Sequence, residues 1–148
     1  MEVLTGSSEQ DALDADTILE LLANRRRRYL LYALRGRTEP IELSILAETI
    51  AGWEQNVPPD EVAKNEYKSV YVSSVQCHVP KLADANVVDH DEDNHSVILS
   101  DSFEQLEPYL TIVVEDEPEN STLQTALEAD SSGGLIGSIR QNVSRLTH

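Results

Sequence analysis

The chain has 148 residues and a formal net charge of -16, with 27 acidic residues against 11 basic ones. This length supports one domain with tails rather than two sizeable domains. Cys77 is the single cysteine, which excludes an internal disulfide and favours a reducing, cytoplasmic setting. The first residues lack the basic and apolar segments of a signal peptide, and no stretch approaches the roughly 18 apolar residues of a membrane span. We therefore expect a cytoplasmic protein with no membrane partner.

The charge is unevenly distributed along the chain. Residues 1–23 carry a net charge of -6, residues 24–82 carry +2, and residues 83–148 carry -12. The middle segment is thus the only part that is not strongly acidic, and we expect any contact with a nucleic acid to lie there.

The surface composition is acidic and poor in lysine, with only three Lys among the basic residues. Such a surface suits a halophilic protein, because concentrated salt screens the repulsion between like charges. An acidic protein from an ordinary mesophile would have the same composition, so both readings stay open.

The N-terminal third of the chain predicts a tail and one helix. Residues 1–15 are small, polar and acidic, which is typical of a disordered segment. Asp16 is a candidate N-cap for a helix over residues 17–34, whose apolar residues recur at helical spacing. Gly36 is expected to end this helix in the left-handed conformation.

The next segment predicts a short extended piece at residues 40–43 and a second helix at residues 45–54, capped by Ser44. The paired prolines Pro58 and Pro59 predict a loop over residues 55–60, since each proline restricts the residue before it to extended conformations.

Residues 65–82 predict a long helix, extending to about residue 85, with Tyr67, Tyr71, Val75, Val79 and Leu82 as its apolar stripe. Pro80 is expected to kink or loosen it, because proline lacks a backbone donor. Asn86 is a candidate left-handed cap at its end. Two β-rich runs, 87–90 and 96–99, flank the turn-forming cluster 91–95 and predict a hairpin.

The last predicted helix opens at Asp101 or Ser102. Its apolar stripe predicts an interface for homodimerisation, because exposed stripes of this kind mark interfaces; the stripe consists of Phe103, Leu106, Leu110 and Val114. Residues 115–134 are acidic and predict a linker, and residues 135–146 predict a short amphipathic helix.

The order of helix, short strand, two helices, hairpin and helix predicts an α+β winged helix-turn-helix domain over residues 16–114, mostly helical, with a small hairpin wing and disordered acidic ends. The segments LELLANRRRRYLLYAL (19–34), EPIELSILAETIAGWE (39–54) and HVPKLADANVVDHD (78–91) resemble an uncharacterised winged helix-turn-helix family from halophilic archaea. This resemblance covers about residues 16–101 and implies DNA binding and gene regulation by analogy with winged helices in general.

The segment HVPKLADANVV also resembles the end of the recognition helix in small bacterial and archaeal repressors. That resemblance implies that Ser73, Ser74, Gln76 and Cys77 face the major groove. Ser and Gln can donate to and accept from base edges, and Gln pairs best with adenine. Lys68 and Lys81 can neutralise phosphates at the two ends of the helix. The alternative is that these polar residues only form the solvated side of an amphipathic helix.

Two further features of the sequence are candidates for DNA contact. Arg25 to Arg28 form the strongest basic cluster, and Arg26 and Arg27 are candidates to clamp phosphates. Equally, the cluster could pair with acidic residues of the same chain, as charge runs often do. The wing tip, ending at His95, would approach the DNA beside the helix, although its sequence DEDNH is acidic and therefore unfavourable next to phosphates.

The sequence contains no pattern that predicts an enzyme or a cofactor. There is no P-loop, glycine-rich dinucleotide motif or nucleophile elbow. Cys77, His78, His90 and His95 match no zinc signature, so solvated or hydrogen-bonded histidines are the favoured interpretation.

Two function hypotheses therefore remain. The first is a transcriptional regulator that reads duplex DNA with the helix at residues 65–85 and the wing at residues 87–99. The second is a winged-helix protein-interaction module that does not bind DNA directly. A continuous positive stripe across residues 25–37 and 68–81 would favour DNA, whereas basic charge that is broken or covered would favour a protein partner.

Overall fold

The computed structural model describes residues 12–117, 123, 126 and 127. Within them the chain is mostly helical with one small antiparallel sheet, which confirms the α+β class. The elements in chain order are α2 (Ala15–Leu22), α3 (Arg25–Leu34), β1 (Ile41–Glu42), α4 (Leu43–Gln55), η1 (Pro59–Glu61), α5 (Lys64–Ser73), η2 (Ser74–His78), α6 (Val79–Asp84), β2 (Val88–Asp91), β3 (Ser96–Leu99), α7 (Phe103–Val113) and η3 (Val114–Asp116).

Two helices, α2 and α3, occupy the segment for which one helix was predicted. Asp14, rather than Asp16, caps α2, and its carboxylate accepts a hydrogen bond from the backbone of Thr17 at 2.8 Å. Asn24 has extended backbone angles, and its side chain accepts hydrogen bonds from the backbone N–H groups of Arg26 and Arg27. A local N-cap of this kind starts a new helix, so the chain changes direction inside the continuous apolar pattern.

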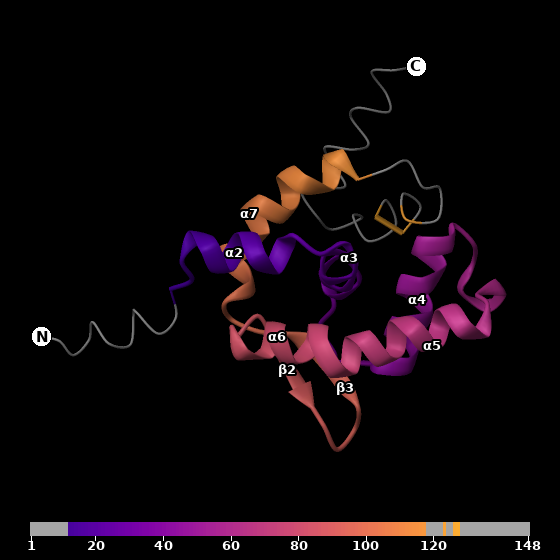
Figure 1. The fold of residues 1–148 in the computed structure, drawn as a ribbon. Coiled ribbons are helices and arrows are strands. Elements are labelled where there is room, and N and C mark those ends of the chain that lie inside the picture. Colours follow the sequence, from indigo (N-terminus) through magenta and orange to yellow (C-terminus); the bar gives the residue numbers. More distant parts are fainter. Residues whose placement is uncertain (1–11, 118–122, 124–125, 128–148) are drawn as a thin grey trace, which may run out of the picture.

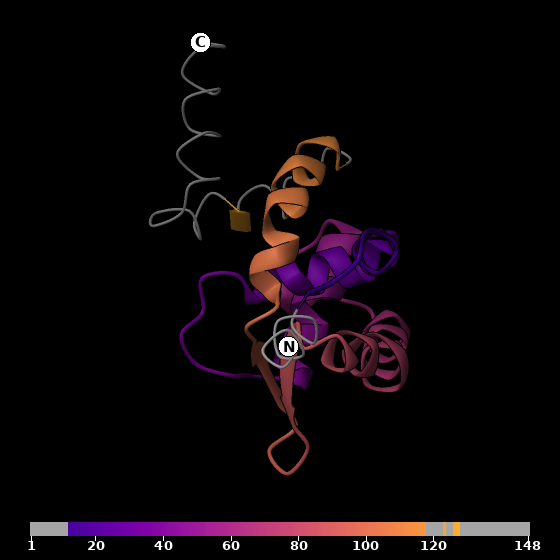
Figure 2. The same ribbon diagram turned by 90° about the vertical axis from the view of Figure 1, so that its left-hand side faces the viewer.

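The sheet joins residues that are far apart in the sequence. Its strand order is β1-β3-β2, and both pairings are antiparallel. The predicted hairpin is confirmed: β2 pairs with β3 from Val88 opposite Leu99 to Asp91 opposite Ser96. The short strand β1 adds to the other edge of β3, with Ile41 opposite Val97. Both ribbon views show the hairpin tip projecting away from the helices (Figures 1 and 2).

The segment from Lys64 to Asp84 is one continuous helical run in which α5 and α6 are joined by the π-helical turn η2. This wider turn lies directly before Pro80, which occupies the first turn of α6 and has no backbone N–H to donate. The predicted loosening of the helix near Pro80 thus takes the form of a π turn. The run ends at Asn86, whose φ of 62° confirms the predicted left-handed cap.

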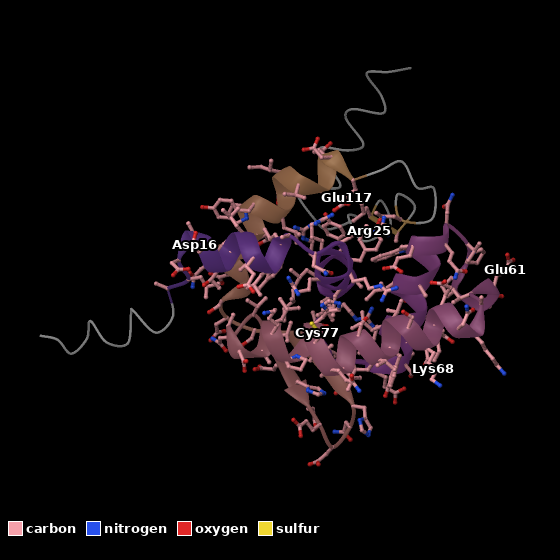
Figure 3. All side chains as sticks on the ribbon, viewed as in Figure 1. Asp16, Arg25, Glu61, Lys68, Cys77 and Glu117 are labelled. Atoms are coloured by element: carbon pink, nitrogen blue, oxygen red, sulfur yellow. The ribbon has the colours of Figure 1, made fainter. Side chains whose placement is uncertain are left out.

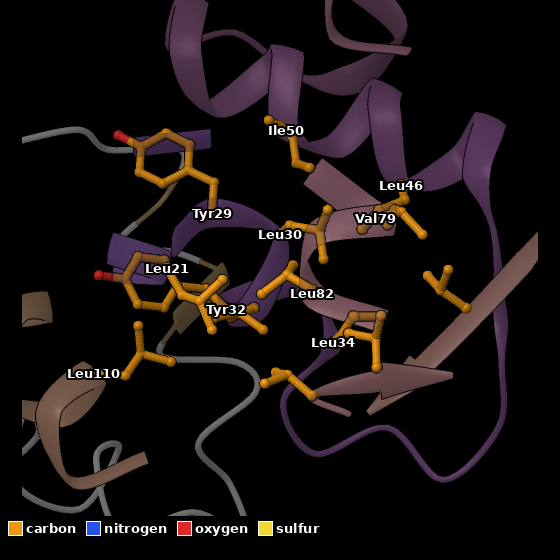
Figure 4. Close-up of a cluster of buried hydrophobic side chains, with 14 of the residues drawn as sticks. Leu21, Tyr29, Leu30, Tyr32, Leu34, Leu46, Ile50, Val79, Leu82 and Leu110 are labelled. Carbon is orange, nitrogen blue, oxygen red and sulfur yellow. The ribbon is translucent and has the colours of Figure 1, made fainter. Parts of the chain in front are cut away.

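The core forms where α3 and α7 pack against the other helices and the sheet. Leu30 and Leu82 lie near the middle of the cluster in Figure 4, and Ile50, Tyr32, Leu21 and Leu110 lie around them. The predicted dimer stripe belongs to this core: Phe103 is 7% exposed, Leu106 and Leu110 are 0% exposed, and Val114 is 1% exposed. The prediction that these four residues form a dimer interface is therefore wrong, because their side chains are used within the protomer.

Part of the segment predicted as an acidic linker also belongs to the folded body. Glu117, Leu123 and Leu127 are buried, and the two leucines join the hydrophobic core. The N-terminal tail up to residue 11 and the amphipathic helix predicted at residues 135–146 lie outside the described residues. Among the described helices, none combines the length and apolar character that crossing a bilayer requires.

The two faces of α7 should respond differently to truncation. Replacing Leu110 by Ala removes a fully buried side chain, and we expect it to lower the free energy of unfolding by about 2–5 kcal/mol. Ile112→Ala, on the same helix at 66% exposure, is the matched control and should cost less than about 0.5 kcal/mol. Urea denaturation of both variants in one buffer measures the difference. Equal losses would contradict the packing described for α7.

Candidate functional site

The continuous helix of residues 64–84 presents an exposed, largely polar surface, which we call the outer face. Figure 3 shows Lys68 on the side of α5 that points away from α7 and Glu117. In the part of the chain that the structure describes, no ion pair engages Lys64 or Lys68. The exposed residues that make up the outer face are Lys64, Asn65, Lys68, Val72, Gln76, Pro80 and Asp84.

The inner face of the same helix contains the predicted apolar stripe and adds polar residues to it: Val79 and Leu82 are fully buried, and Tyr67, Tyr71 and Val75 pack against the core. Val70, Ser74 and His78, each four residues apart, are buried, whereas Tyr67 and Tyr71 are only partly buried. The prediction that Ser74 contacts a base is therefore wrong, because its side chain is 2% exposed and points into the protein. The inner face tolerates polar residues because it packs against the arginine cluster of α3.

Arg26 connects three helices. Its Nε lies 2.6 Å and its Nη2 lies 2.9 Å from the two carboxylate oxygens of Glu54 on α4, a bidentate ion pair. Its Nη1 donates to the hydroxyls of Ser69 and Ser73 on α5 at 3.3 and 3.2 Å. Ser73 thus binds Arg26 instead of presenting a hydroxyl to a partner, and Arg26 has its charge compensated inside the protein.

Arg27 closes the C-terminal end of α2. Its guanidinium donates to the carbonyls of Leu21 and Glu20 at 3.0 and 2.8 Å, and these are among the last carbonyls of α2. A cation at this end of a helix also complements the helix dipole. The side chain is 7% exposed, so the prediction that Arg27 clamps a phosphate is wrong.

His78 provides a further hydrogen-bond acceptor for Arg27. Its Nδ1 lies 3.4 Å from Nη1 of Arg27 in a buried position. Burial and the neighbouring guanidinium groups of Arg27 and Arg26 lower the pKa of His78 to about 4. The imidazole is therefore neutral near pH 7, as an acceptor for Arg27 must be.

Arg28 binds the segment that follows α7. Its Nε lies 2.6 Å from Glu117, whose side chain is 1% exposed, and its Nη1 donates to the carbonyl of Leu22 at 2.8 Å. Tyr32 donates its hydroxyl to the same carboxylate at 2.6 Å. Burial and this bond raise the pKa of Tyr32, so its phenol stays a donor. Arg25 lies over the ring of Tyr29, with 5.9 Å between its guanidinium carbon and the ring centroid.

Lys81 and the wing also do not contribute to the continuous positive stripe that would favour DNA. The ammonium of Lys81 lies 3.0 Å from the carboxylate of Glu20, and this pair lowers the pKa of Glu20. His95 is exposed at the hairpin tip with a φ of 52°, and its carbonyl accepts from the backbone of Leu43. The tip beside it is acidic: Asp91 accepts hydrogen bonds from the backbone of Asp93 and Asn94.

Of the predicted contact residues, Lys68 and Gln76 belong to the outer face, and the structure adds Lys64 to them; Cys77 is exposed on the same helical run. Lys64 lies one helical turn before Lys68, a spacing that is visible in the sequence, but the helix was predicted to begin after it. Among the described residues, no group of three or more His, Cys, Asp or Glu side chains has an arrangement that could hold a metal ion.

The low pKa of His78 predicts that the protein loses stability in acid. The pKa in the folded state, about 4, lies below the ordinary value of 6.5, so the native state prefers the neutral imidazole. The resulting stability is complete above about pH 6.5 and is lost as the pH falls towards 4, by about 1–3 kcal/mol.

His78→Gln should lack this component, because glutamine does not titrate. The measurement is the free energy of unfolding of both proteins at several pH values between 7.5 and 4. Parallel curves for the wild type and the variant would contradict the proposed origin of the effect.

The contact of Glu117 with Arg28 and Tyr32 makes a second prediction. Glu117→Ala should lower the free energy of unfolding by about 2–4 kcal/mol, since it leaves two largely buried donors without their acceptor. The neighbouring exposed residue offers a charge-matched control, Asp116→Ala, which should change stability by less than about 0.5 kcal/mol. Denaturant titration at constant salt compares the two, and a similar small effect of both would show that the contact does not hold this segment.

Comparison with known proteins gives one match. Residues 19–98 match the model of a family described as a domain of unknown function, DUF7344. No curated protein and no solved structure matches the chain significantly. The matched region runs from α2 to β3 and includes the whole outer face, and it covers more than half of the sequence. The chain therefore belongs to the DUF7344 family.

Proposed function

We propose that this protein is a winged helix-turn-helix regulator that binds duplex DNA through the outer face of the helix at residues 64–84. The observation that carries the proposal is the order of elements. Helix α4 precedes the long helix, the hairpin β2–β3 follows it at once, and β1 closes a sheet of order β1-β3-β2. In winged helices this arrangement places the second helix of the pair in the major groove.

The chemistry of the outer face supports the same proposal. Lys64 and Lys68 provide two cations in the first turns of the helix, suited to phosphates. Gln76 lies two turns further on and offers a donor and an acceptor to a base edge. Ser73, Ser74, Arg26, Arg27 and Lys81 are engaged within the protein, so this proposal assigns them the support of the helix rather than DNA contact.

The number of available cations sets the expected mode of binding. Counterion release scales with the number of phosphates neutralised, and two lysines neutralise few. Affinity should therefore depend weakly on salt, and base edges and groove shape should supply a large share of the specificity. Such binding is compatible with a halophilic source, which the resemblance to a haloarchaeal family and the acidic composition favour.

A protein-interaction module is the second candidate, and a specific observation favours it. The expected positive stripe is interrupted, because Arg26, Arg28 and Lys81 are paired with Glu54, Glu117 and Glu20. The exposed acidic wing tip at residues 91–93 would repel phosphates but would attract a basic protein surface. Homodimerisation also stays a prediction, and in this fold it would use the outer side of α7, where Tyr109 and Ile112 are exposed.

Binding experiments on outer-face variants test the DNA proposal. Duplex selected from genomic fragments is titrated with protein in 0.1 to 1 M potassium chloride, followed by fluorescence anisotropy. Lys68→Ala should weaken binding to all sequences alike and flatten the salt dependence. Gln76→Ala should reduce discrimination between selected and random duplex by about 1–3 kcal/mol, the value of one good base contact.

Arg37→Gln is the matched control, because it removes one exposed cation that lies outside the outer face. It should leave the affinity for DNA within about twofold. If this variant loses as much affinity as Lys68→Ala, binding does not depend on the outer face. If the wild type binds no duplex at 0.1 M salt, the protein-interaction module becomes the better proposal.

A further inference from the structure

A pocket of about 210 Å³ is lined by residues of α3, the turn after it, β1, α4 and residues 126–127. Its walls are mainly apolar and include the rings of Tyr32 and Trp53 and the side chains of Ile41 and Leu127. An engineered apolar cavity of about 150 Å³ accepts benzene. This pocket therefore has room for one aromatic ring together with a small substituent.

Arg37 gives the pocket a positive charge. The residue lines the pocket and is exposed, and in the described part of the chain no acidic side chain is paired with it. Its position follows from the end of α3: Gly36 adopts a φ of 81°, and the backbone of Arg37 then donates to the carbonyl of Leu34 at 3.2 Å. This left-handed turn returns the chain over the pocket, where a guanidinium can bind a carboxylate with two parallel hydrogen bonds.

The walls are held in place by contacts that do not involve a ligand. Tyr32 donates its hydroxyl to Glu117 at 2.6 Å, which fixes the ring at one wall. Trp53 is 4% exposed and precedes Glu54, whose carboxylate binds Arg26. Thr49 lies one turn before Trp53 on α4, and its hydroxyl donates to the carbonyl of Ile45 at 3.0 Å. The pocket is therefore largely preformed, as small-molecule sites are.

The geometry points to a binding site for a small aromatic monocarboxylate, with its ring in the apolar pocket lined by Tyr32 and Trp53 and its carboxylate on Arg37. The acidic character of the rest of the chain supports the assignment of Arg37 as the group that binds the carboxylate. With a net charge of -16, most of the surface repels anions, and an unpaired arginine beside an apolar pocket is a local exception. The inference is independent of the proposed DNA contact, since the pocket and the outer face share no residue.

Trp53 is the single tryptophan of the chain, so its fluorescence reports directly on the pocket. The full chain in 1 M potassium chloride is titrated with phenylacetate and, as the neutral counterpart, with phenylacetamide. We expect a saturable change in Trp53 fluorescence with phenylacetate and an affinity at least about tenfold lower for the amide, because a charge-assisted hydrogen-bond pair is lost.

Three variants complete the test. Arg37→Gln should reduce the difference between acid and amide to less than about twofold, whereas Lys64→Gln, which removes an exposed cation elsewhere, should leave it unchanged. Ala33→Leu adds volume at the pocket wall and should abolish the response to both probes. A response that persists in Ala33→Leu, an equal loss in Lys64→Gln, or no saturable response in the wild type would overturn the inference.

Discussion

The guanidinium groups of Arg26, Arg27 and Arg28 leave the first turn of α3 in three directions, and each reaches a different neighbour. Arg26 reaches Glu54 on α4 and two serines on α5, Arg27 reaches the end of α2, and Arg28 reaches Glu117 after α7. Most of the helices are positioned relative to α3 by one of these contacts. The apolar core supplies most of the free energy of folding, but it is not directional, whereas bidentate ion pairs and carbonyl contacts specify orientation.

This arrangement explains the composition of the long helix. A buried guanidinium requires acceptors, because leaving a charged donor without them costs several kcal/mol. Ser69, Ser73 and His78 supply oxygen and nitrogen acceptors on the side of the helix that faces α3. The polarity of this helix therefore has two origins: its inner side binds the arginines, and its outer side is exposed to solvent. The same ion pairs leave Lys64 and Lys68 as the cations of the outer face.

The position of α4 links the two surfaces for which we propose ligands. Its Glu54 holds Arg26, and through Arg26 the α5 helix, while Trp53 and Thr49 on the same helix line the pocket. Trp53 and Glu54 are adjacent on α4. Trp53 lines the pocket, whereas Glu54 binds Arg26, which in turn holds the helix that carries the outer face. This proximity provides contiguous packing between the two surfaces, and a measured effect of one ligand on the other would be needed to establish coupling.

The order of the elements from β1 to α7 and several of their ends could be predicted from the sequence alone. Local signals carry this information: Gly36 and Asn86 adopt the left-handed conformations expected of them, and the turn cluster at residues 91–95 joins β2 and β3. The break between α2 and α3 escaped prediction because the apolar pattern runs through it, although the N-cap Asn24 is visible. Of the proposed contact residues, Gln76 and Cys77 were implied by the resemblance to repressor helices and Lys68 by its charge at the start of the helix, and all three are exposed.

Only the tertiary structure decided what the arginines bind and which side of the long helix is buried. The partners of Arg26 and Arg28 lie 28 and 89 residues away, and the chain offers 27 acidic residues to choose from, so no sequence spacing selects Glu54 or Glu117. Ser74 was expected to face outward from the resemblance to repressor helices, but it lies four residues after the buried Val70 and is buried on the same side of the helix. In the same way, the stripe on α7 looks identical in sequence whether it faces a second copy or the core. Its burial against α3 depends on how the helices pack, which local periodicity does not encode.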